Sequence, residues 1–141
     1  MKAAVYYETG GPEVFRYEDV PDPVCDASSV LIDVGAISIE GGDTLHRAGG
    51  EMAARPHIVG YQCAGVICAV GERVSDRKVG QRVVAVMMHR RVHAMIQRHL
   101  EDVTRGALQV VVDRTFPLAE AAAAHAFIES RQAFGRVVLI P

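Results

Sequence analysis

The stretch Pro56–Val70 has the sequence PHIVGYQCAGVICAV, which is apolar and rich in β-branched residues. Gly60 and Gly65 interrupt it, and glycines within a strand mark bends or a close approach of two backbones, as at the corners of small barrels. A turn follows, and Arg82–Met88 (RVVAVMM) is a further apolar strand. Short strands separated by closely spaced turns predict a small β-barrel or sandwich.

The residues before this stretch have the same character. Met1–Tyr7 and Phe15–Val20 are short strand-like segments that flank the turn sequence TGGP. Val30–Ile39 (VLIDVGAISI) alternates apolar with small or polar residues, which is typical of a half-buried strand. Asp43 is then predicted to cap a short helix over Thr44–Ala48.

The last third of the chain has a different pattern. Arg90–Arg105 carries apolar residues at the spacing of one helical face, and Ala119–Ser130 is a helix by composition. Between them, Val110–Val112 is expected to be a short strand, and Arg136–Ile140 (RVVLI) a closing strand.

Composition limits the class of protein. The chain has 141 residues, of which 50% are hydrophobic and 23% charged, with a net charge of −2. These values predict one globular domain, with a single seam between residues 1–88 and 89–141. They argue against nucleic-acid and membrane-surface binding. Three irregularly spaced cysteines and the lack of a signal-like or membrane-spanning segment favour a cytoplasmic location with reduced thiols.

Several segments together resemble one family. The opening MKAAVYYETGGPEVFRYEDVPDP, the sequence GYQCAGVI at residues 60–67 with VG at 70–71, and VGQRV at 79–83 stand in this order. At the far end, FPLAEAA (116–122) precedes GRVVL (135–139). The set resembles the medium-chain dehydrogenases/reductases, especially the zinc-free quinone oxidoreductase branch, although Gln81 replaces the usual Asp. The resemblance implies a mainly β fold with α-helices: a GroES-like β-barrel with the C-terminal helices packed on it.

The same resemblance indicates that the middle of the family chain is absent. Family members are more than twice as long and carry a Rossmann domain for NADPH between the matched ends, whereas here Met88 leads directly into the late helix. The chain contains no G-x-G-x-x-G sequence, and its few helices do not suffice for a doubly wound sheet. NADPH is therefore implied by ancestry only, and no bound cofactor is expected.

A metal site is not expected either. At the positions of the zinc branch's cysteine and histidine ligands, this chain has Glu40 and Tyr61, and a phenol is a poor zinc ligand. His89 and His93 have a metal-competent spacing, but the arginines around them favour a solvated helix face or, as an alternative, an anion site. Cys63 is expected to be a buried, inert thiol.

The resemblance also points to a residual pocket. Ser38 ends the third strand at a position where the family places a polar residue lining the cleft, and Tyr61 and Gln62 correspond to the cleft floor. Asp43 belongs to the same group. Arg47 lies where family members carry a basic residue near the cofactor phosphates; because the Rossmann domain is missing, a surface cation is the alternative. The alternative for the whole group is a structural role.

Two functions of different classes remain open. The first is a quinone oxidoreductase- or alcohol dehydrogenase-like protein reduced to its substrate domain, either naturally or as an excised scaffold, with NADPH-dependent reduction impaired or lost. The second is a non-redox small-molecule binder, cyclase or isomerase using polar groups of the pocket. A purely structural module is a third reading. Because removal of a domain exposes apolar surface, a homodimer is expected, with C-terminal elements exchanged between chains as one form.

Overall fold

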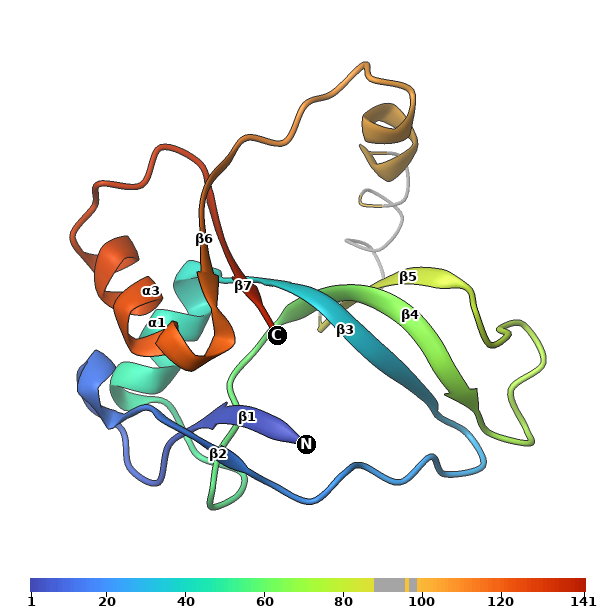
Figure 1. Ribbon diagram of the computed structural model, residues 1–141, viewed down its shortest axis with the longest axis horizontal. Helices are drawn as coiled ribbons and strands as arrows, with labels where there is room; N and C mark the ends of the chain where they lie inside the picture. Colours follow the sequence, from blue (N-terminus) through green and yellow to red (C-terminus); the bar gives the residue numbers. More distant parts are fainter. Residues whose placement is uncertain (88–95, 97–98) are drawn as a thin grey trace.

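The computed structural model describes residues 1–87, 96 and 99–141 (Figure 1). The elements are β1 (Lys2–Val5), η1 (Pro12–Val14), β2 (Arg16–Asp19), β3 (Val30–Ser38), α1 (Gly41–Gly49), β4 (Gln62–Val70), β5 (Arg82–Val86), β6 (Val112–Pro117), η2 (Leu118–Glu120), α3 (Ala121–Glu129) and β7 (Arg136–Ile140). Residues 99–104 are also helical. The fold is mixed α/β.

Five strands form one sheet in the order β5-β4-β3-β7-β6, and β1 pairs with β2 in a separate two-stranded sheet. Neighbours in the large sheet are antiparallel except β6 and β7, which are parallel. Because β6 and β5 are open edges in the described part of the chain, the sheet does not close on itself. The expected GroES-like barrel is therefore not confirmed. A single parallel pair is also far from a doubly wound sheet, as expected.

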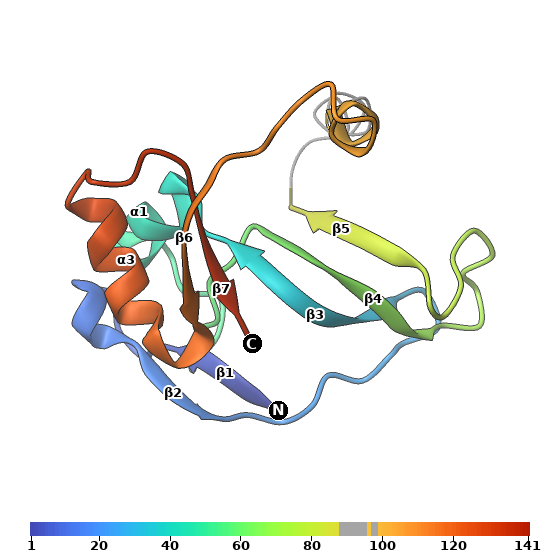
Figure 2. The ribbon, with the colours of Figure 1, turned by 45° about the horizontal axis from the view of Figure 1, so that its top comes forward.

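Strand β3 connects two halves of the large sheet. It pairs with β4 along most of its length, and its last two residues, Ile37 and Ser38, pair with Leu139 and Val138 of β7. Helices α1 and α3 and the β1–β2 hairpin gather at one end of this sheet, whereas the β4–β5 hairpin extends from the other (Figures 1 and 2). The C-terminal elements therefore complete the end of the molecule at which β3 leads into α1.

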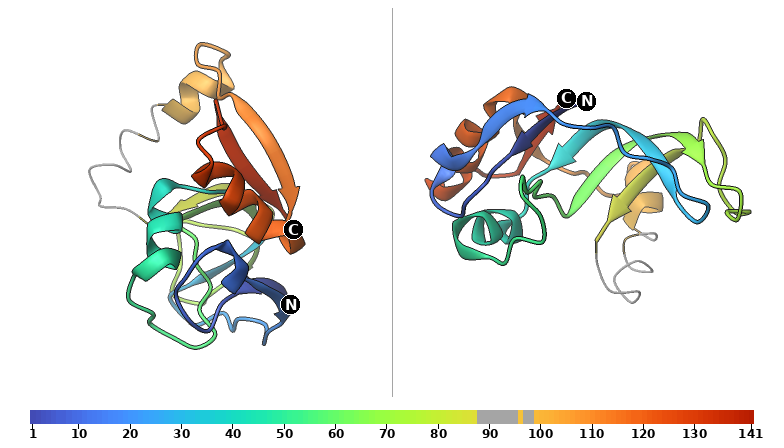
Figure 3. Two further views of the ribbon diagram at one scale, coloured as in Figure 1. Left: turned by 90° about the vertical axis from the view of Figure 1, so that its left-hand side faces the viewer. Right: turned by 90° about the horizontal axis from the view of Figure 1, so that it is seen from below.

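The core lies at that end. It joins β1, the residue after β3, α3 and β7 through six small or branched side chains: Ala4, Ile39, Ala121, Ala124, Val137 and Leu139. Tyr6 forms an isolated bridge with His57, which ties the segment before β4 to the hairpin. Figure 3 shows the hairpin and both helices from two further sides.

Several predicted boundaries need correction. The strand expected over Pro56–Val70 begins only at Gln62, because before it only His57 is paired, in an isolated bridge with Tyr6 just after β1. The helix expected over Thr44–Ala48 begins at Gly41, so its N-cap is Glu40 and not Asp43.

The structure confirms some of the C-terminal predictions and corrects others. The closing strand Arg136–Ile140 is confirmed as β7, and the helix expected at Ala119–Ser130 corresponds to η2 and α3. The strand expected at Val110–Val112 instead runs from Val112 to Pro117, where it pairs with β7. Of the predicted helix Arg90–Arg105, the structure describes residues 96 and 99–105; residues 96 and 99–104 are helical and Arg105 is in a turn. His89, His93 and the arginines beside them lie outside the described residues. None of the described helices is long and apolar enough to span a membrane.

Candidate functional site

The N-terminus of α1 is fixed by two acidic residues. Glu40 is the N-cap, and its backbone N–H donates a hydrogen bond to Asp43 Oδ2 at 2.7 Å. Asp43 is 3% exposed, and this burial raises the pKa of its carboxyl group, against the opposing effect of the Glu40 and Tyr61 backbone N–H groups. Asp43 therefore holds the first turn of the helix, which is a positioning role at the edge of the candidate site.

Tyr61 and His46 meet between α1 and the start of β4. The Tyr61 hydroxyl lies 3.4 Å from His46 Nδ1, and His46 Nε2 lies 2.5 Å from the Glu51 backbone carbonyl. Since a carbonyl only accepts, Nε2 carries the proton, and in the neutral ring Nδ1 accepts from the phenol. The tautomer of His46 and the direction of the Tyr61 hydroxyl are thus set by one backbone oxygen.

These two side chains border a surface hollow. Its other lining residues are small or apolar: Gly42, Leu45, Gly49, Gly50 and Ala53, with Glu51 at the rim. A Cβ on Gly42 would lie 2.5 Å from the Tyr61 ring, so glycine at this position lets the ring approach α1 closely. The hollow therefore combines apolar walls with one phenol–imidazole pair, a common composition for small-molecule sites.

Behind the hollow, ring contacts lead into the core. His46 and His57 have ring centroids 4.9 Å apart, and His57 lies 5.2 Å from the ring of the fully buried Tyr6. Burial lowers the pKa of His57, with a smaller effect of His46 in the same direction. His57 is consequently held neutral, and it supports His46 by packing.

A second polar group lies where β3, β4 and β7 come together. Glu40 Oε1 accepts hydrogen bonds from Gln62 Nε2 and Arg136 Nη1. Ser38 ends β3, and its buried Oγ meets no hydrogen-bond partner among the described residues. Of the predicted site residues, Gln62 therefore joins a charged cluster, whereas Ser38 presents an unused hydroxyl.

Arg47 does not behave as a surface cation, and that alternative is wrong. The side chain is 1% exposed. Its guanidinium donates to the Glu129 carboxylate, to the Gly10 carbonyl oxygen and, at 3.4 Å, to His125 Nδ1. Arg47 thus joins α1 to α3 and to the β1–β2 turn, and its cofactor-binding role remains a prediction.

Sequence reasoning missed three residues of the site: Glu40, His46 and Arg136. An acidic residue directly before two glycines and a helix is an N-cap signal that could have identified Glu40. His46 falls three positions after Asp43, on the same side of α1. Arg136 had no local signal, because its partner Glu40 is 96 positions away in sequence.

Within the described residues, no group of three or more His, Cys, Asp or Glu side chains could hold a metal ion. Tyr61 and Gln62 also offer no soft ligand beside Glu40, so this donor set does not fit zinc. A dinucleotide does not fit the parallel β6–α3–β7 unit either, because the turn entering α3 is Pro117–Glu120 and lacks the glycines that admit a pyrophosphate.

Comparison with known proteins agrees with this architecture. Residues 15–139 match the family described as zinc-binding dehydrogenase. The chain therefore belongs to the zinc-binding dehydrogenase family, within the medium-chain dehydrogenase/reductase superfamily. It is 41% identical over 87 residues to sorbitol dehydrogenase of Bacillus subtilis (strain 168), covering 59% of this chain and 24% of that protein. It is 42% identical over 86 residues to quinone oxidoreductase of Lama guanicoe, covering 59% and 26%.

The chain thus spans about a quarter of the length of the curated relatives it matches. A solved mycobacterial structure complexed with NADPH superposes with a TM-score of 0.84 at 16% identity, covering 100% of both chains. At this identity the superposition shows the fold alone.

Proposed function

We propose that the hollow between α1 and β4 binds a small conjugated carbonyl compound, the class that includes quinones. The observation that carries this proposal is the Tyr61–His46 pair at the border of an apolar hollow. A phenol beside an imidazole can hold a carbonyl oxygen and exchange a proton with it. Similarity to quinone oxidoreductases supports the choice of ligand class.

The protonation state of His46 decides what Tyr61 offers the ligand. With a neutral ring, the phenol donates to Nδ1, and its oxygen can only accept from a bound molecule. When both ring nitrogens are protonated, Nδ1–H donates to the Tyr61 oxygen, and the phenol proton is free to bond to a carbonyl oxygen. The pair therefore functions as a proton donor when His46 is charged.

We further propose that this chain alone does not carry out NADPH-dependent reduction, the activity implied by ancestry. NADPH would supply a hydride when bound, but neither the sequence nor the β6–α3–β7 turn offers a cradle for its pyrophosphate. The lack of a pyrophosphate cradle also favours a second candidate function, acid–base isomerisation of a carbonyl compound. This reaction needs the Tyr61–His46 pair and no hydride.

Calorimetric titration with tetramethyl-1,4-benzoquinone tests the proposal. We expect saturable binding that weakens about threefold to tenfold in Tyr61→Phe, which removes one hydrogen bond and keeps the ring. Tyr17→Phe is the matched control, since Tyr17 lies on β2 away from the hollow and is 43% exposed. No saturable binding, or equal binding by both variants, would show that the site is not a carbonyl site.

A parallel assay follows NADPH absorbance with the same quinone. The expected result is no NADPH oxidation above the protein-free rate. Quinone-dependent turnover abolished by Tyr61→Phe would instead overturn the proposed loss of reduction and place the reductase activity in this chain.

A further inference from the structure

A second hollow lies on the other half of the molecule. It is bounded by β3, β4 and β5 and by the helical residues 99–104, which approach it through Leu100 and Thr104. Its volume is about 900 Å³, and it shares no lining residue with the hollow at Tyr61. Figure 2 shows the helical turn and the β3–β4–β5 part of the sheet that border this groove.

The floor of the groove is apolar and open to solvent. Val66 on β4 is 40% exposed and Val84 on β5 is 43% exposed, although both residues are paired within the sheet. Gly35 adds depth, because a Cβ there would have no neighbour closer than 3.9 Å. Exposed apolar surface of this kind in a hollow marks a binding surface.

The charged lining that the described residues give the groove is positive. Arg77 and Arg82 line it, and among the described residues no acidic side chain does, although Asp33 lies opposite Val66 on β3. Arg77 is paired with Asp76 at 2.8 Å, whereas Arg82, which precedes Val83 on β5, has no ion-pair partner among the described residues. The groove therefore joins an apolar floor to unpaired positive charge.

We propose that this groove binds an elongated apolar molecule that ends in a carboxylate, such as a medium-chain fatty acid. The hydrocarbon lies over Val66, Val84 and the small residues of β3 and β4. The carboxylate pairs with Arg82, whose planar fork matches a carboxylate geometrically. A neutral or cationic amphiphile of equal length would bury the same apolar surface without this pairing.

Calorimetry with decanoate, decanol and decyltrimethylammonium, each below its self-association concentration, tests the proposal. Decanoate should bind with a stoichiometry of one and at least tenfold more tightly than the other two. Arg82→Gln should weaken decanoate about tenfold and leave decanol unchanged. Val84→Glu, which places a carboxylate on the floor, should weaken decanoate more strongly, whereas Val24→Glu, at a side chain that is 89% exposed, should not.

Equal binding of the three amphiphiles would overturn the proposal. So would decanoate binding that survives both Arg82→Gln and Val84→Glu. Binding to anionic vesicles without binding of free decanoate would show a lipid-surface contact in its place. Circular dichroism of each variant monitors folding, and if Val84→Glu fails to fold, the charge-selective effect of Arg82→Gln decides alone.

Discussion

The buried histidine of α3 predicts an acid-sensitive fold. His125 is 2% exposed, and its Nδ1 accepts a hydrogen bond from Arg47 Nε. Its ring lies 4.7 Å from the Phe15 ring, edge on. Burial, with a further contribution from Arg47, lowers the pKa of His125 from 6.5 to about 4.

The difference between the pKa values of His125 in the folded and unfolded chain sets the sign and size of this pH dependence of stability. Between pH 6.5 and pH 4 the unfolded chain carries a proton on this histidine and the folded chain does not, so the free energy of unfolding rises with pH across this window. One pKa unit corresponds to about 1.4 kcal/mol. His125 therefore contributes about 3 kcal/mol of stability at pH 7 that is lost as the pH falls to 4.

Urea denaturation at pH 7, 6, 5 and 4 measures this contribution. His125→Gln can still accept from Arg47 but does not titrate, so the stability difference between wild type and variant should change by about 3 kcal/mol across the series. His99→Gln is the control, because the side chain of His99 is 60% exposed. Parallel pH curves for wild type and His125→Gln would refute the reasoning.

Three further predictions concern the packing of the fold. Gly65→Ala should lower the free energy of unfolding by about 2 kcal/mol, because the added Cβ would lie 2.2 Å from the Asp33 carbonyl oxygen, whereas Gly35→Ala should be nearly neutral in the same urea titration. Arg47→Met should cost about 3 kcal/mol through loss of its buried hydrogen bonds, seen as a lower urea midpoint; an unchanged midpoint would contradict the assigned role. Burial raises the pKa of the Cys63 thiol, so iodoacetamide should modify it more slowly than the exposed Cys68 at pH 7.5, as measured by mass spectrometry of peptides.

Alternation of apolar and polar residues predicted a strand well where its two faces have different environments. The alternation in Val30–Ile39 locates β3 to within one residue, because one side of the strand packs and the other does not. Pro56–Val70 lacks such alternation, so its apolar character could not reveal that pairing begins only at Gln62. The barrel was inferred from resemblance, and strand number alone does not determine closure.

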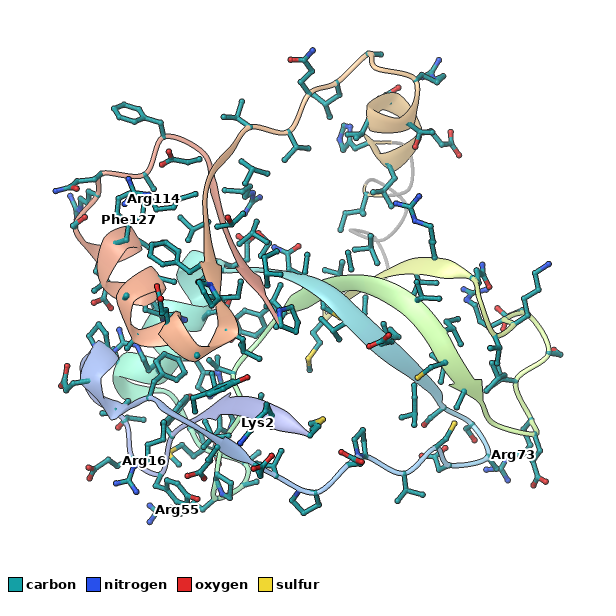
Figure 4. The ribbon with its side chains drawn as sticks, in the orientation of Figure 1. Lys2, Arg16, Arg55, Arg73, Arg114 and Phe127 are labelled. Carbon is teal, nitrogen blue, oxygen red and sulfur yellow. The ribbon has the colours of Figure 1, made fainter. Side chains whose placement is uncertain are left out.

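Only those residues of the site that are close together in sequence could be predicted. Tyr61 and Gln62 were identified together, and both lie at the start of β4 facing groups of α1. The burial of Arg47 and the pairing of Glu40 depend on partners in the last fifteen residues of the chain, Glu129 and Arg136. Figure 4 shows most labelled arginines at the periphery, where this residue type usually lies. The same general expectation led to the incorrect alternative that Arg47 is a surface cation.

The pairing of β7 with β3 has a consequence for how this protein could be divided. Ile37 and Leu139 are about 100 residues apart, yet β7 is an interior strand of the sheet. The β3–β4–β5 meander and the β6–α3–β7 unit each satisfy their own internal backbone pairing, and they meet along only two residue pairs of the ladder. Two separately expressed fragments, cut in the connection between β5 and β6, would therefore have to reassemble mainly through the shared core and the Arg47–Glu129 and Glu40–Arg136 pairs, with little help from the ladder.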